Sequence, residues 1–480
     1  MPQMAPVHFP ILASCLRSLG YKVKLLDEVS SNAIEMGLKH VNNDACYPAI
    51  VAIGQLLEPV SAGKIDPNTS ALLLAQTCGP CRATNYPALL HWALQDLHAT
   101  NIPVVTLQGS DLKDEKLHLK IGLTGLKRLT LSLLYGDLLQ SLYLHCHTYE
   151  QVPGTALKLV QQYHQELSPE VLSDAKQFKR RVHEMVAEFS RIPLRHEVRP
   201  KVGIVGEILL KYHPDANNEL VEHIIEEGGE PILGDISAFV LYCLHDSIYQ
   251  AQNLGTSKLK ATVSWLLLHS FERKRRIIIN ALKHSKFEPL PCFSDLMKYG
   301  QKFVSLGQQA GEGWLLTAEM VDFIEHKIEN IICVQPFACL PNHITGKGVM
   351  RAIRETYANA NLCSIDYEAG SAQSNVINRL KLFLTQAKDN LIAQQQADAA
   401  QASQQAKSKT AAAADAAANM VITRAAGPDM TEHKDIYPLT HFAFMYARAD
   451  NDEFNFSPEV REEKESMKRK MVSGDKRQAQ

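Results

Sequence analysis

The sequence predicts an α/β protein with parallel sheets covered by helices, a helical insert and a disordered C-terminal tail. Short apolar runs typical of buried strands alternate with periodic apolar segments typical of helices. This alternation stops at a long helical stretch and begins again near Pro200. Large apolar residues become scarce beyond Gln394, so the last part of the chain is expected to lie outside a folded core.

These changes in pattern divide the 480 residues into five segments. We expect a first α/β domain at residues 1–120, a helical bridge at residues 121–198 and a second α/β domain at residues 199–393. Residues 394–425 are rich in Ala and Gln and are expected to form a linker. Residues 426–480 hold one short apolar patch and many charges, which predicts a mostly disordered tail.

The first domain begins with a helix where an α/β domain normally begins with a strand. The helix-like segment PILASCLRSLG precedes the apolar run Tyr21–Leu26, which we interpret as a strand. Either the first strand is trimmed to almost nothing or the chain is one part of a longer gene product, and the second explanation is favoured. The other elements expected here are helices Ser31–Lys39, Ala49–Leu57 and Tyr86–Leu97 and strands Ala71–Ala75 and Ile102–Leu107.

Helical and α/β patterns follow in turn. Segments Gly122–Tyr149 and Pro169–Arg191 look helical, and strand Lys201–Gly206 opens the second α/β domain. Further strands are expected at Pro231–Leu233, Asn330–Gln335 and Asn361–Asp366, and helices at Asn217–Glu227, Ser257–His284, Thr317–His326, Gly346–Tyr357 and Ala372–Ala393. Strands that alternate with helices predict parallel sheets. We interpret the cationic run Arg273–Arg276 as a solvated helix face.

Charge and apolar content exclude several partner classes. The chain has 50 Lys and Arg against 52 Asp and Glu, a net charge of −2, so nothing indicates a nucleic-acid or membrane partner. No apolar run reaches the roughly 18 residues that span a bilayer, and the N-terminus lacks the pattern of a signal peptide. We therefore expect a cytoplasmic protein whose 10 cysteines are reduced thiols, available for metal binding or redox chemistry.

Three cysteines occupy similar places in the predicted elements. Cys46 lies in a loop that enters a helix, with Pro48 two residues on. Cys81 comes after a strand, and Cys339 lies just past strand Asn330–Gln335. Because the carboxyl ends of parallel strands face one crevice, these thiols are expected to converge there. Thiolates near positive helix N-termini suit an iron–sulfur cluster, and three ligands leave one iron open.

The CGPC segment that holds Cys78 and Cys81 supports two other interpretations. Between a strand and a helix, such a segment is the redox dithiol of thioredoxin-like folds. However, the residue before Cys78 is not the tryptophan typical of thioredoxins, and polar residues follow Cys81. A zinc site of these two cysteines with the distant pair His145/Cys146 is also possible, although no second CxxC or HxxxH stands at zinc-finger spacing.

The other cysteines and a glycine-rich segment give weaker indications. A cysteine in an apolar element usually acts as a small core residue. We expect this role for Cys15, Cys243, Cys333 and Cys363 and leave Cys146 and Cys292 open. The segment TGKG around Lys347 lacks the upstream Gly and the Ser or Thr after Lys of a phosphate-binding loop. An anionic group such as a CoA phosphate could still bind at that helix N-terminus.

Six segments in the same order resemble one protein family. They are MPQMAPVHFPILASCLRSLGYKV, NNDACYPAIVAIGQLLE, AQTCGPCRATNYPALL, KVGIVGEILLKYHPDANN, VQPFACLPNHITGKGVM and SIDYEAGSAQSNVINRLKLFL. The sequence is similar to the C-terminal, dehydratase-like part of the large activator-like proteins related to (R)-2-hydroxyacyl-CoA dehydratases and their activators. These proteins are in turn similar to double-cubane-cluster proteins. The resemblance covers about Met1–Asp389.

The resemblance implies repeated flavodoxin-like domains that hold an oxygen-sensitive iron–sulfur cluster, either [4Fe–4S] or a double cubane. It implies Cys46, Cys81 and Cys339 as cluster ligands, with Cys78 as a further candidate. Electrons would come from a separate ATP-hydrolysing activator protein of the acetate/sugar-kinase fold. Relatives use such electrons to dehydrate a 2-hydroxyacyl-CoA through a ketyl radical or to reduce small molecules.

An acyl-CoA substrate would need a CoA site, for which Lys347 and His343 are the candidate residues. Large family members carry ATPase domains in front, in the same chain, and this sequence shows no nucleotide loop of the Walker or kinase type. We therefore expect an iron–sulfur redox component that depends on a separate activator and could form a dimer. The alternatives are a non-catalytic remnant or partner-binding fragment of a split protein, and a thiol–disulfide redox protein that uses Cys78 and Cys81.

Overall fold

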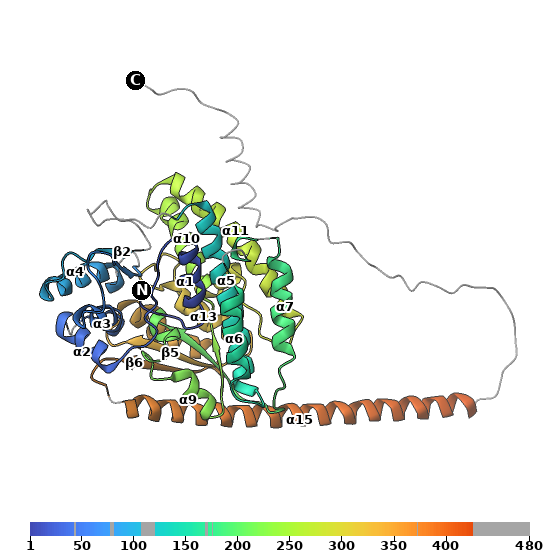
Figure 1. The fold of residues 1–480 in the computed structure, drawn as a ribbon. Coiled ribbons are helices and arrows are strands. Elements are labelled where there is room, and N and C mark those ends of the chain that lie inside the picture. Colours follow the sequence, from blue (N-terminus) through green and yellow to red (C-terminus); the bar gives the residue numbers. More distant parts are fainter. Residues whose placement is uncertain are drawn as a thin grey trace, which may run out of the picture. The chain divides into compact units, whose positions relative to one another are not determined.

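The computed structural model describes residues 1–42, 45–76, 81–106, 121–168, 171–174, 176–371 and 373–425. It confirms an α/β protein with two parallel sheets (Figure 1). The chain divides into two compact units, Met1–Ser403 and Gln404–Gln480. All sites and contacts that follow lie in the first unit, and the predicted tail, residues 426–480, falls outside the described residues.

The N-terminal part holds a two-stranded sheet with helices beside it. Strand β1 (Leu72–Leu74) pairs in parallel with β2 (Val104–Thr106). The helices are α1 (Phe9–Ser18), α2 (Ser31–His40), α3 (Tyr47–Ser61) and α4 (Tyr86–Asp96), with a 3₁₀ turn, η1, at Arg82–Asn85. Helix α3 is buried from Tyr47 to Leu57 because it packs against both α2 and α4.

The expected strand at Tyr21–Leu26 is wrong, because this segment forms a single parallel bridge, to Pro2. Other groups take the backbone acceptors that a strand would use. The Arg17 guanidinium donates to the Val23 carbonyl at 2.8 Å, and the N-terminal ammonium donates to the Lys24 carbonyl at 3.1 Å. Hydrogen bonds from Arg17 and from the N-terminus therefore hold this segment, and it does not pair within a sheet.

The predicted helical bridge consists of α5 (Leu123–Tyr149), α6 (Thr155–Glu166) and α7 (Phe178–Ser190). Its apolar side chains share one core with α10 (Ile236–Asn253) and α11 (Lys258–Lys283). The sequence analysis placed no helix at α10. The helical part is therefore larger than predicted, and it joins the bridge to the second α/β segment.

The larger sheet holds four parallel strands in the order β4–β3–β5–β6. Their bounds are β3 Lys201–Gly206, β4 Glu230–Leu233, β5 Asn330–Pro336 and β6 Asn361–Tyr367. Along β5, Ile332 and Val334 join one apolar core while Ile331 and Cys333 join another. Both faces of the sheet are covered, which explains why this strand is a continuous apolar run.

The remaining helices lie between the strands of the larger sheet in the chain, or follow the last of them. They are α8 (Ile208–Tyr212), α9 (Leu220–Glu226), α12 (Phe293–Gln301), α13 (Trp314–Glu325), α14 (Met350–Thr356) and α15 (Gln373–Ala425). Helix α15 includes residues 394–425, the predicted linker, and the high helix propensity of Ala and Gln accounts for this. Within the described part of the chain, no helix is both long and apolar enough to cross a membrane.

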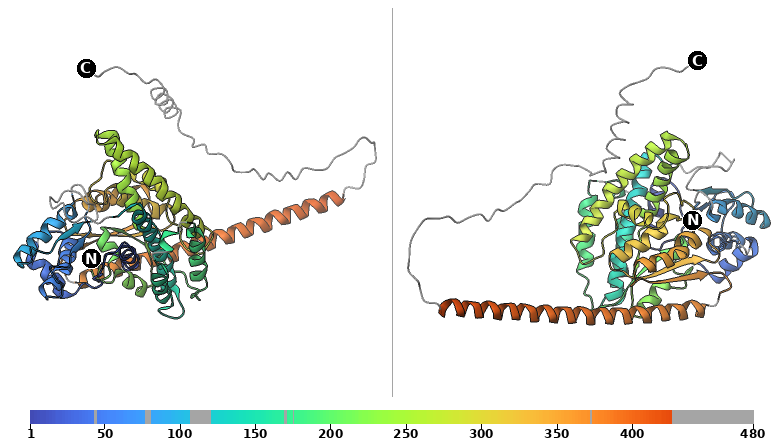
Figure 2. Two further views of the ribbon diagram at one scale, coloured as in Figure 1. Left: turned by 45° about the horizontal axis from the view of Figure 1, so that its top comes forward. Right: turned by 180° about the vertical axis from the view of Figure 1, so that it is seen from behind.

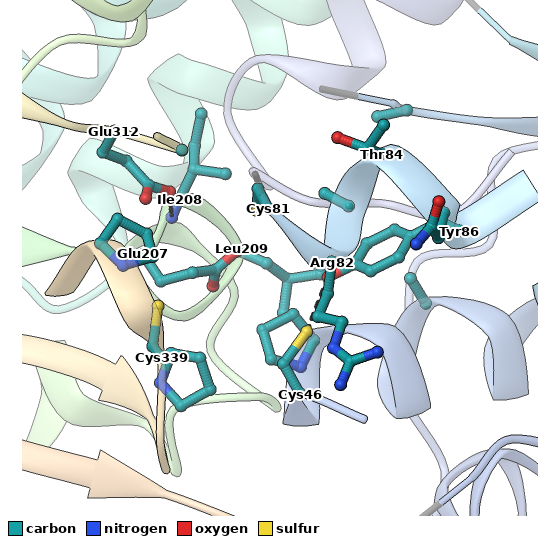
Figure 3. A pocket seen from close by; sticks show the side chains of 18 of the residues that line it. Cys46, Cys81, Arg82, Thr84, Tyr86, Glu207, Ile208, Leu209, Glu312 and Cys339 are labelled. Carbon is teal, nitrogen blue, oxygen red and sulfur yellow. Dashed lines mark hydrogen bonds between the residues drawn. The ribbon is translucent and has the colours of Figure 1, made fainter. Parts of the chain in front are cut away.

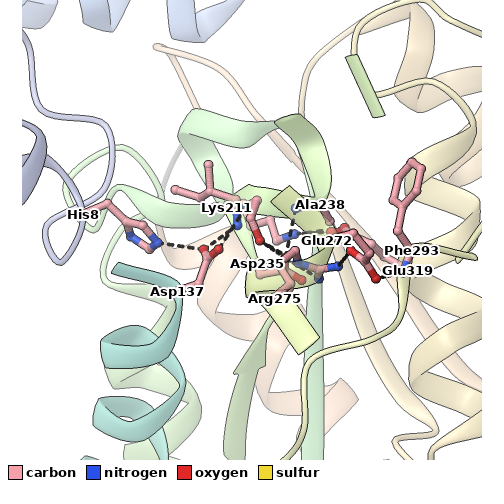
Figure 4. A network of polar contacts seen from close by, with 12 residues as sticks. His8, Asp137, Lys211, Asp235, Ala238, Glu272, Arg275, Phe293 and Glu319 are labelled. Carbon is pink, nitrogen blue, oxygen red and sulfur yellow. Dashed lines mark hydrogen bonds and ion pairs between the residues drawn. The ribbon is translucent and has the colours of Figure 1, made fainter. Parts of the chain in front are cut away.

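A buried polar network connects α5, α10 and α11 (Figure 4). Arg275 is fully buried and forms ion pairs with Asp235 at 2.7 Å and Glu272 at 3.0 Å. Asp137 of α5 accepts hydrogen bonds from the first two amides of α10, at 2.8 and 3.1 Å, and lies 2.9 Å from the His8 ring. Burial alone lowers the pKa of Arg275, but Asp235 and Glu272 raise it above its usual value, so the guanidinium stays charged.

The interpretation of Arg273–Arg276 as a solvated face is therefore wrong at Arg275. Arg273 and Arg276 are exposed and Lys274 is half-buried. A helix turns by about 100° per residue, so one member of a four-residue cationic run can face the core. Arg275 faces the core because the carboxylates of Asp235 and Glu272 pair with its guanidinium there.

Replacement of Arg275 tests this network. Arg275→Met should lower the free energy of unfolding by about 3–5 kcal/mol, because Asp235 and Glu272 then stay buried without a counter-charge. Arg276→Met, at the exposed neighbouring position, should change it by less than about 0.5 kcal/mol. Urea unfolding followed by far-UV circular dichroism measures both, and equal midpoints for the two variants would contradict the network's role.

A second ion pair, between α5 and α9, makes stability depend on pH. His147 lies 3.0 Å from Glu222 and 3.3 Å from Glu150. The hydrogen bond with Glu222 raises the pKa of His147 above 6.5 and lowers that of Glu222 below 4.5. The stabilisation that His147 contributes to the folded state is therefore complete below the pKa of His147 in the unfolded chain. It is lost as the pH rises through the pKa of His147 in the folded protein. The stabilisation that Glu222 contributes is complete above the pKa of Glu222 in the unfolded chain. It is lost as the pH falls through the pKa of Glu222 in the folded protein.

His147→Gln should consequently destabilise the protein more at about pH 6 than at about pH 9. The difference should not exceed about 1 kcal/mol, because both side chains reach solvent. Urea titrations at the two pH values measure it, with His183→Gln, at an exposed position of α7, as the control. An effect of equal size at both pH values would argue against this ion pair.

Candidate functional site

Strands of both sheets end at one cavity of about 600 Å³ (Figure 3). Its wall includes Leu74 at the end of β1, Glu207 directly after β3 and Pro336 at the end of β5. Parallel α/β sheets bind ligands at this carboxyl edge, and small-molecule sites have volumes of roughly 300–1000 Å³. Position and size make this cavity the candidate functional site.

Cys46 reaches the cavity from the N-terminus of α3. Its backbone is extended, with φ −61° and ψ 146°, and its carbonyl accepts from the Ala49 amide at 2.9 Å, so it caps the helix. Pro48 fits the first turn because no amide hydrogen is needed there. The Cys46 sulfur lies 3.3 Å from the hydroxyl of Tyr86, the first residue of α4. Burial raises the pKa of Cys46 to about 11.

Cys81 lines the same cavity as the residue before η1. Gly311, in the loop between α12 and α13, lies beside it. A Cβ added to Gly311 would stand 3.8 Å from the Cys81 sulfur and 2.9 Å from Cγ of Pro341. With a φ of +57°, Gly311 also has a backbone conformation that favours glycine. The missing side chain therefore lets the segments of Cys81 and Pro341 approach the same loop.

Cys339 follows β5 in a tight loop. The preceding residue, Ala338, has a φ of +57°, which is uncommon for a residue with a side chain. The Asn342 side-chain amide donates to the Cys339 sulfur at 3.3 Å, and the His343 amide donates to the Cys339 carbonyl at 2.9 Å. These contacts hold the sulfur at the cavity wall. Burial, and next the nearby Glu312, raise the pKa of Cys339 to about 12.

Two carboxyl groups that the sequence analysis did not identify also line the cavity. Glu207 caps α8 by accepting from the Leu210 amide at 2.9 Å, and Glu312 accepts from the Ile208 amide at 3.1 Å. Both carboxyls thus bind the same helical turn. Burial raises the pKa of both, and Glu312 raises that of Glu207 further. Such a pair favours sharing a proton over carrying two charges.

A sequence signal exists for one of these two acids. Glu207 stands between a buried strand and an apolar helix, in the stretch GEILL, the same kind of position that identified the cysteines. Glu312 lies in the irregular loop before α13, where no pattern indicates it. Its role follows from the fold alone.

The thiols are less acidic than their helix positions predict. A helix N-terminus favours a negative charge nearby, and thiolates are expected at these positions. For Cys46 and Cys339, loss of solvent outweighs this effect and raises the pKa of both thiols. A metal bound here would have to displace their protons.

The structure brings three of the four predicted metal ligands to one cavity. Cys46, Cys81 and Cys339 come from separate segments and line the same cavity. Cys78 lies outside the described residues. Among the described residues, no three His, Cys, Asp or Glu side chains are gathered around a single point as ligands of one metal ion. Three soft thiols along a cavity wall match the donor type of an iron–sulfur cluster, in which separate irons take separate ligands.

The residues predicted for CoA lie beside the cavity and not in its wall. Lys347 and His343 are exposed, and neither lines the cavity. Lys347 Nζ lies 3.4 Å from a carboxylate oxygen of Asp366. His343 Nδ1 lies 2.8 Å from the Cys339 carbonyl oxygen.

The other described cysteines do not line the cavity. Cys15 and Cys333 are fully buried in apolar cores, as predicted. Cys146 is also buried and donates to the Phe189 carbonyl at 3.5 Å, while His145 lies 2.8 Å from Glu230. Neither half of the pair considered for zinc therefore faces the cavity.

Comparisons with known proteins give no assignment, since no protein-family model, curated protein or solved structure matches the chain. The function is therefore argued from the site.

The close approach at Gly311 can be tested with a matched glycine. Gly255 also has a positive φ, +68°, but a Cβ there would meet nothing within 4 Å. Gly255→Ala should lower the free energy of unfolding by about 1–2 kcal/mol through backbone strain alone. Gly311→Ala should cost about 1–3 kcal/mol more, because it also overpacks the contact with Pro341. Urea unfolding compares the two, and equal losses would show that this contact relaxes freely.

Proposed function

We propose that this chain is an iron–sulfur redox protein of the 2-hydroxyacyl-CoA dehydratase and activator-related family, which its six sequence segments resemble. The proposed ligands are Cys46, Cys81 and Cys339 around a [4Fe–4S] cluster, with electrons from a separate ATP-hydrolysing activator. One observation carries the proposal. Three cysteines that are far apart in the sequence line a single cavity at the carboxyl ends of parallel strands.

A cluster in this cavity would supply one-electron transfer, and one of its irons would lack a cysteine ligand. The protein's own groups would adjust it. The Tyr86 hydroxyl and the Asn342 amide each lie 3.3 Å from a ligand sulfur, and hydrogen bonds to sulfur tune the potential of such centres. Glu207 and Glu312, which share the wall, can give or take a proton when a bound molecule is reduced.

The proposal extends to fold family, location and substrate class. Parallel pairing in both sheets supports flavodoxin-like domains, and we place the protein in the cytoplasm. An acyl-CoA is the substrate class that the resemblance suggests. Lys347 and His343, exposed on the segment after Cys339, would meet such a molecule outside the cavity.

Serine variants test the ligand set. The wild-type protein, purified without oxygen, should hold about four irons and as many sulfides, with absorption near roughly 400 nm that dithionite bleaches. Cys46→Ser, Cys81→Ser and Cys339→Ser should each lose most of this iron, because serine is a poor ligand for such clusters. Cys292→Ser is the matched control, since Cys292 is also a half-buried helix cap but does not line the cavity.

Other outcomes would redirect the assignment. Unchanged iron in all three cavity variants would contradict the ligand set. About eight irons would indicate the double cubane and make Cys78 a further ligand to test. A protein that stays iron-free after reconstitution would overturn the proposal. It would favour a remnant, or a dithiol protein in which Cys78→Ser abolishes disulfide reductase activity.

A further inference from the structure

Cys333 is a buried thiol that stands close to a proposed cluster ligand and is not itself one. It lies on β5, an inner strand of the larger sheet, which the right view of Figure 2 shows from behind. The Cys333 thiol donates to Oδ1 of Asn342 at 3.6 Å. The amide nitrogen of the same Asn342 side chain donates to the Cys339 sulfur at 3.3 Å. One asparagine side chain therefore connects the buried thiol with the sulfur of a proposed ligand.

The two ends of the Asn342 side chain have different hydrogen-bonding roles. Its oxygen can only accept and its nitrogen can only donate. A cysteine that binds a metal has lost its proton, so its sulfur can only accept. With a metal on Cys339, the amide must therefore turn its nitrogen toward that sulfur. A flipped amide would place its oxygen against the sulfur, and because Asn342 is fully buried, water could not compensate for the lost hydrogen bond.

The Cys333 thiol selects between these two orientations. The terminal torsion of an asparagine is broad and roughly two-fold, so it does not fix the orientation by itself. Cys333 is fully buried, and burial, and next the nearby Cys339, raise the pKa of its thiol, which therefore keeps its proton. This proton can be donated to the amide oxygen of Asn342 but not to the amide nitrogen. The hydrogen bond is thus made only when the nitrogen faces Cys339.

The turn Asn342–Gly346, which carries the asparagine, is held by the neighbouring helix α13. The Thr317 hydroxyl of α13 donates to the Thr345 carbonyl at 2.6 Å. Gly346 leaves room for the contact between thiol and amide, because a Cβ there would stand 3.2 Å from both the Cys333 sulfur and the asparagine oxygen. With the backbone held in this way, the orientation of the amide depends on its side-chain contacts.

We propose that Cys333 is a positioning residue of the metal centre, whose thiol proton holds the Asn342 amide so that its nitrogen donates to the Cys339 sulfur. This inference rests on the proposed redox function. A hydrogen bond to a ligand sulfur stabilises the reduced cluster, which carries more negative charge, and so raises its reduction potential. Cys333 thereby adjusts the potential of the centre without contacting it.

The first readout is the midpoint potential of the iron-loaded protein, from an anaerobic redox titration followed by absorbance. Asn342→Leu removes the donor to the ligand sulfur, and Cys333→Ala removes the proton that orients this donor. Both variants should keep the wild-type iron content, since neither residue is a proposed ligand, and both should shift the midpoint to a more negative potential. Cys333→Ser keeps a donor and should shift the midpoint less than Cys333→Ala.

Cys15→Ala is the matched control, since Cys15 is also fully buried but belongs to a different apolar core. It should leave the midpoint potential unchanged. An unchanged midpoint in Cys333→Ala, or an equal shift in Cys15→Ala, would overturn the positioning role. A shift in Asn342→Leu alone would also overturn it, because the amide would then keep its orientation without the thiol.

The second readout needs no cluster. Urea unfolding of the iron-free protein is measured for Cys333→Ala, Asn342→Leu and the double variant. The double variant should lose less free energy of unfolding than the sum of the two single losses, because each single change leaves its buried partner without a hydrogen bond. Cys15→Ala combined with Asn342→Leu should give additive losses. Additive losses in both pairs would refute the contact between Cys333 and Asn342.

The two readouts separate this inference from the cluster assignment. An iron-free protein in which Cys333 and Asn342 are coupled would refute the redox function, and with it the effect on the potential, whereas the hydrogen-bonded orientation of Asn342 would stand. An iron-loaded protein in which Cys333→Ala leaves the midpoint unchanged would keep the cluster and refute the positioning role.

Discussion

Arg275 has no contact with solvent, so its charge must be balanced inside the protein. Asp235 and Glu272 balance it, and Asp137 holds the first amides of α10 beside them. An isolated buried ion is far more costly than a paired one. Helices α5, α10 and α11 are therefore restricted to packings that bring these groups together. The same contacts anchor the base of the hairpin that α10 and α11 form.

Around the cavity, burial acts on acidic groups. Cys46, Cys339, Glu207 and Glu312 line the cavity at partly or largely buried positions, and the pKa of each is raised because its charged form loses solvent. The metal centre proposed for this cavity would change this balance, because its positive charge would stabilise the thiolate forms. The Arg275 network, by contrast, already has its counter-charges.

More of the candidate site than of the fold could be predicted from the sequence. Cys46 and Cys339 could be placed together because both stand at the transition from strand or loop to helix, and parallel strands end at a common edge. Arg275 could not be recognised as buried, because the carboxylates that receive it come from other helices. The strand expected at Tyr21–Leu26 failed for a similar reason, since Arg17 and the N-terminus occupy its backbone acceptors. Glu312 depends on how its loop returns to the sheet, and local pattern does not encode that path.

The topology explains why the hairpin of α10 and α11 stands near the cavity. The chain leaves β4 at the carboxyl edge of the sheet and must return to the amino edge before β5 begins, since the two strands are parallel. Helix α13 makes this return and packs on β3 and β5. The preceding elements, α10 to α12, are thus inserted at the edge where the strands end, which is also the edge that forms the cavity.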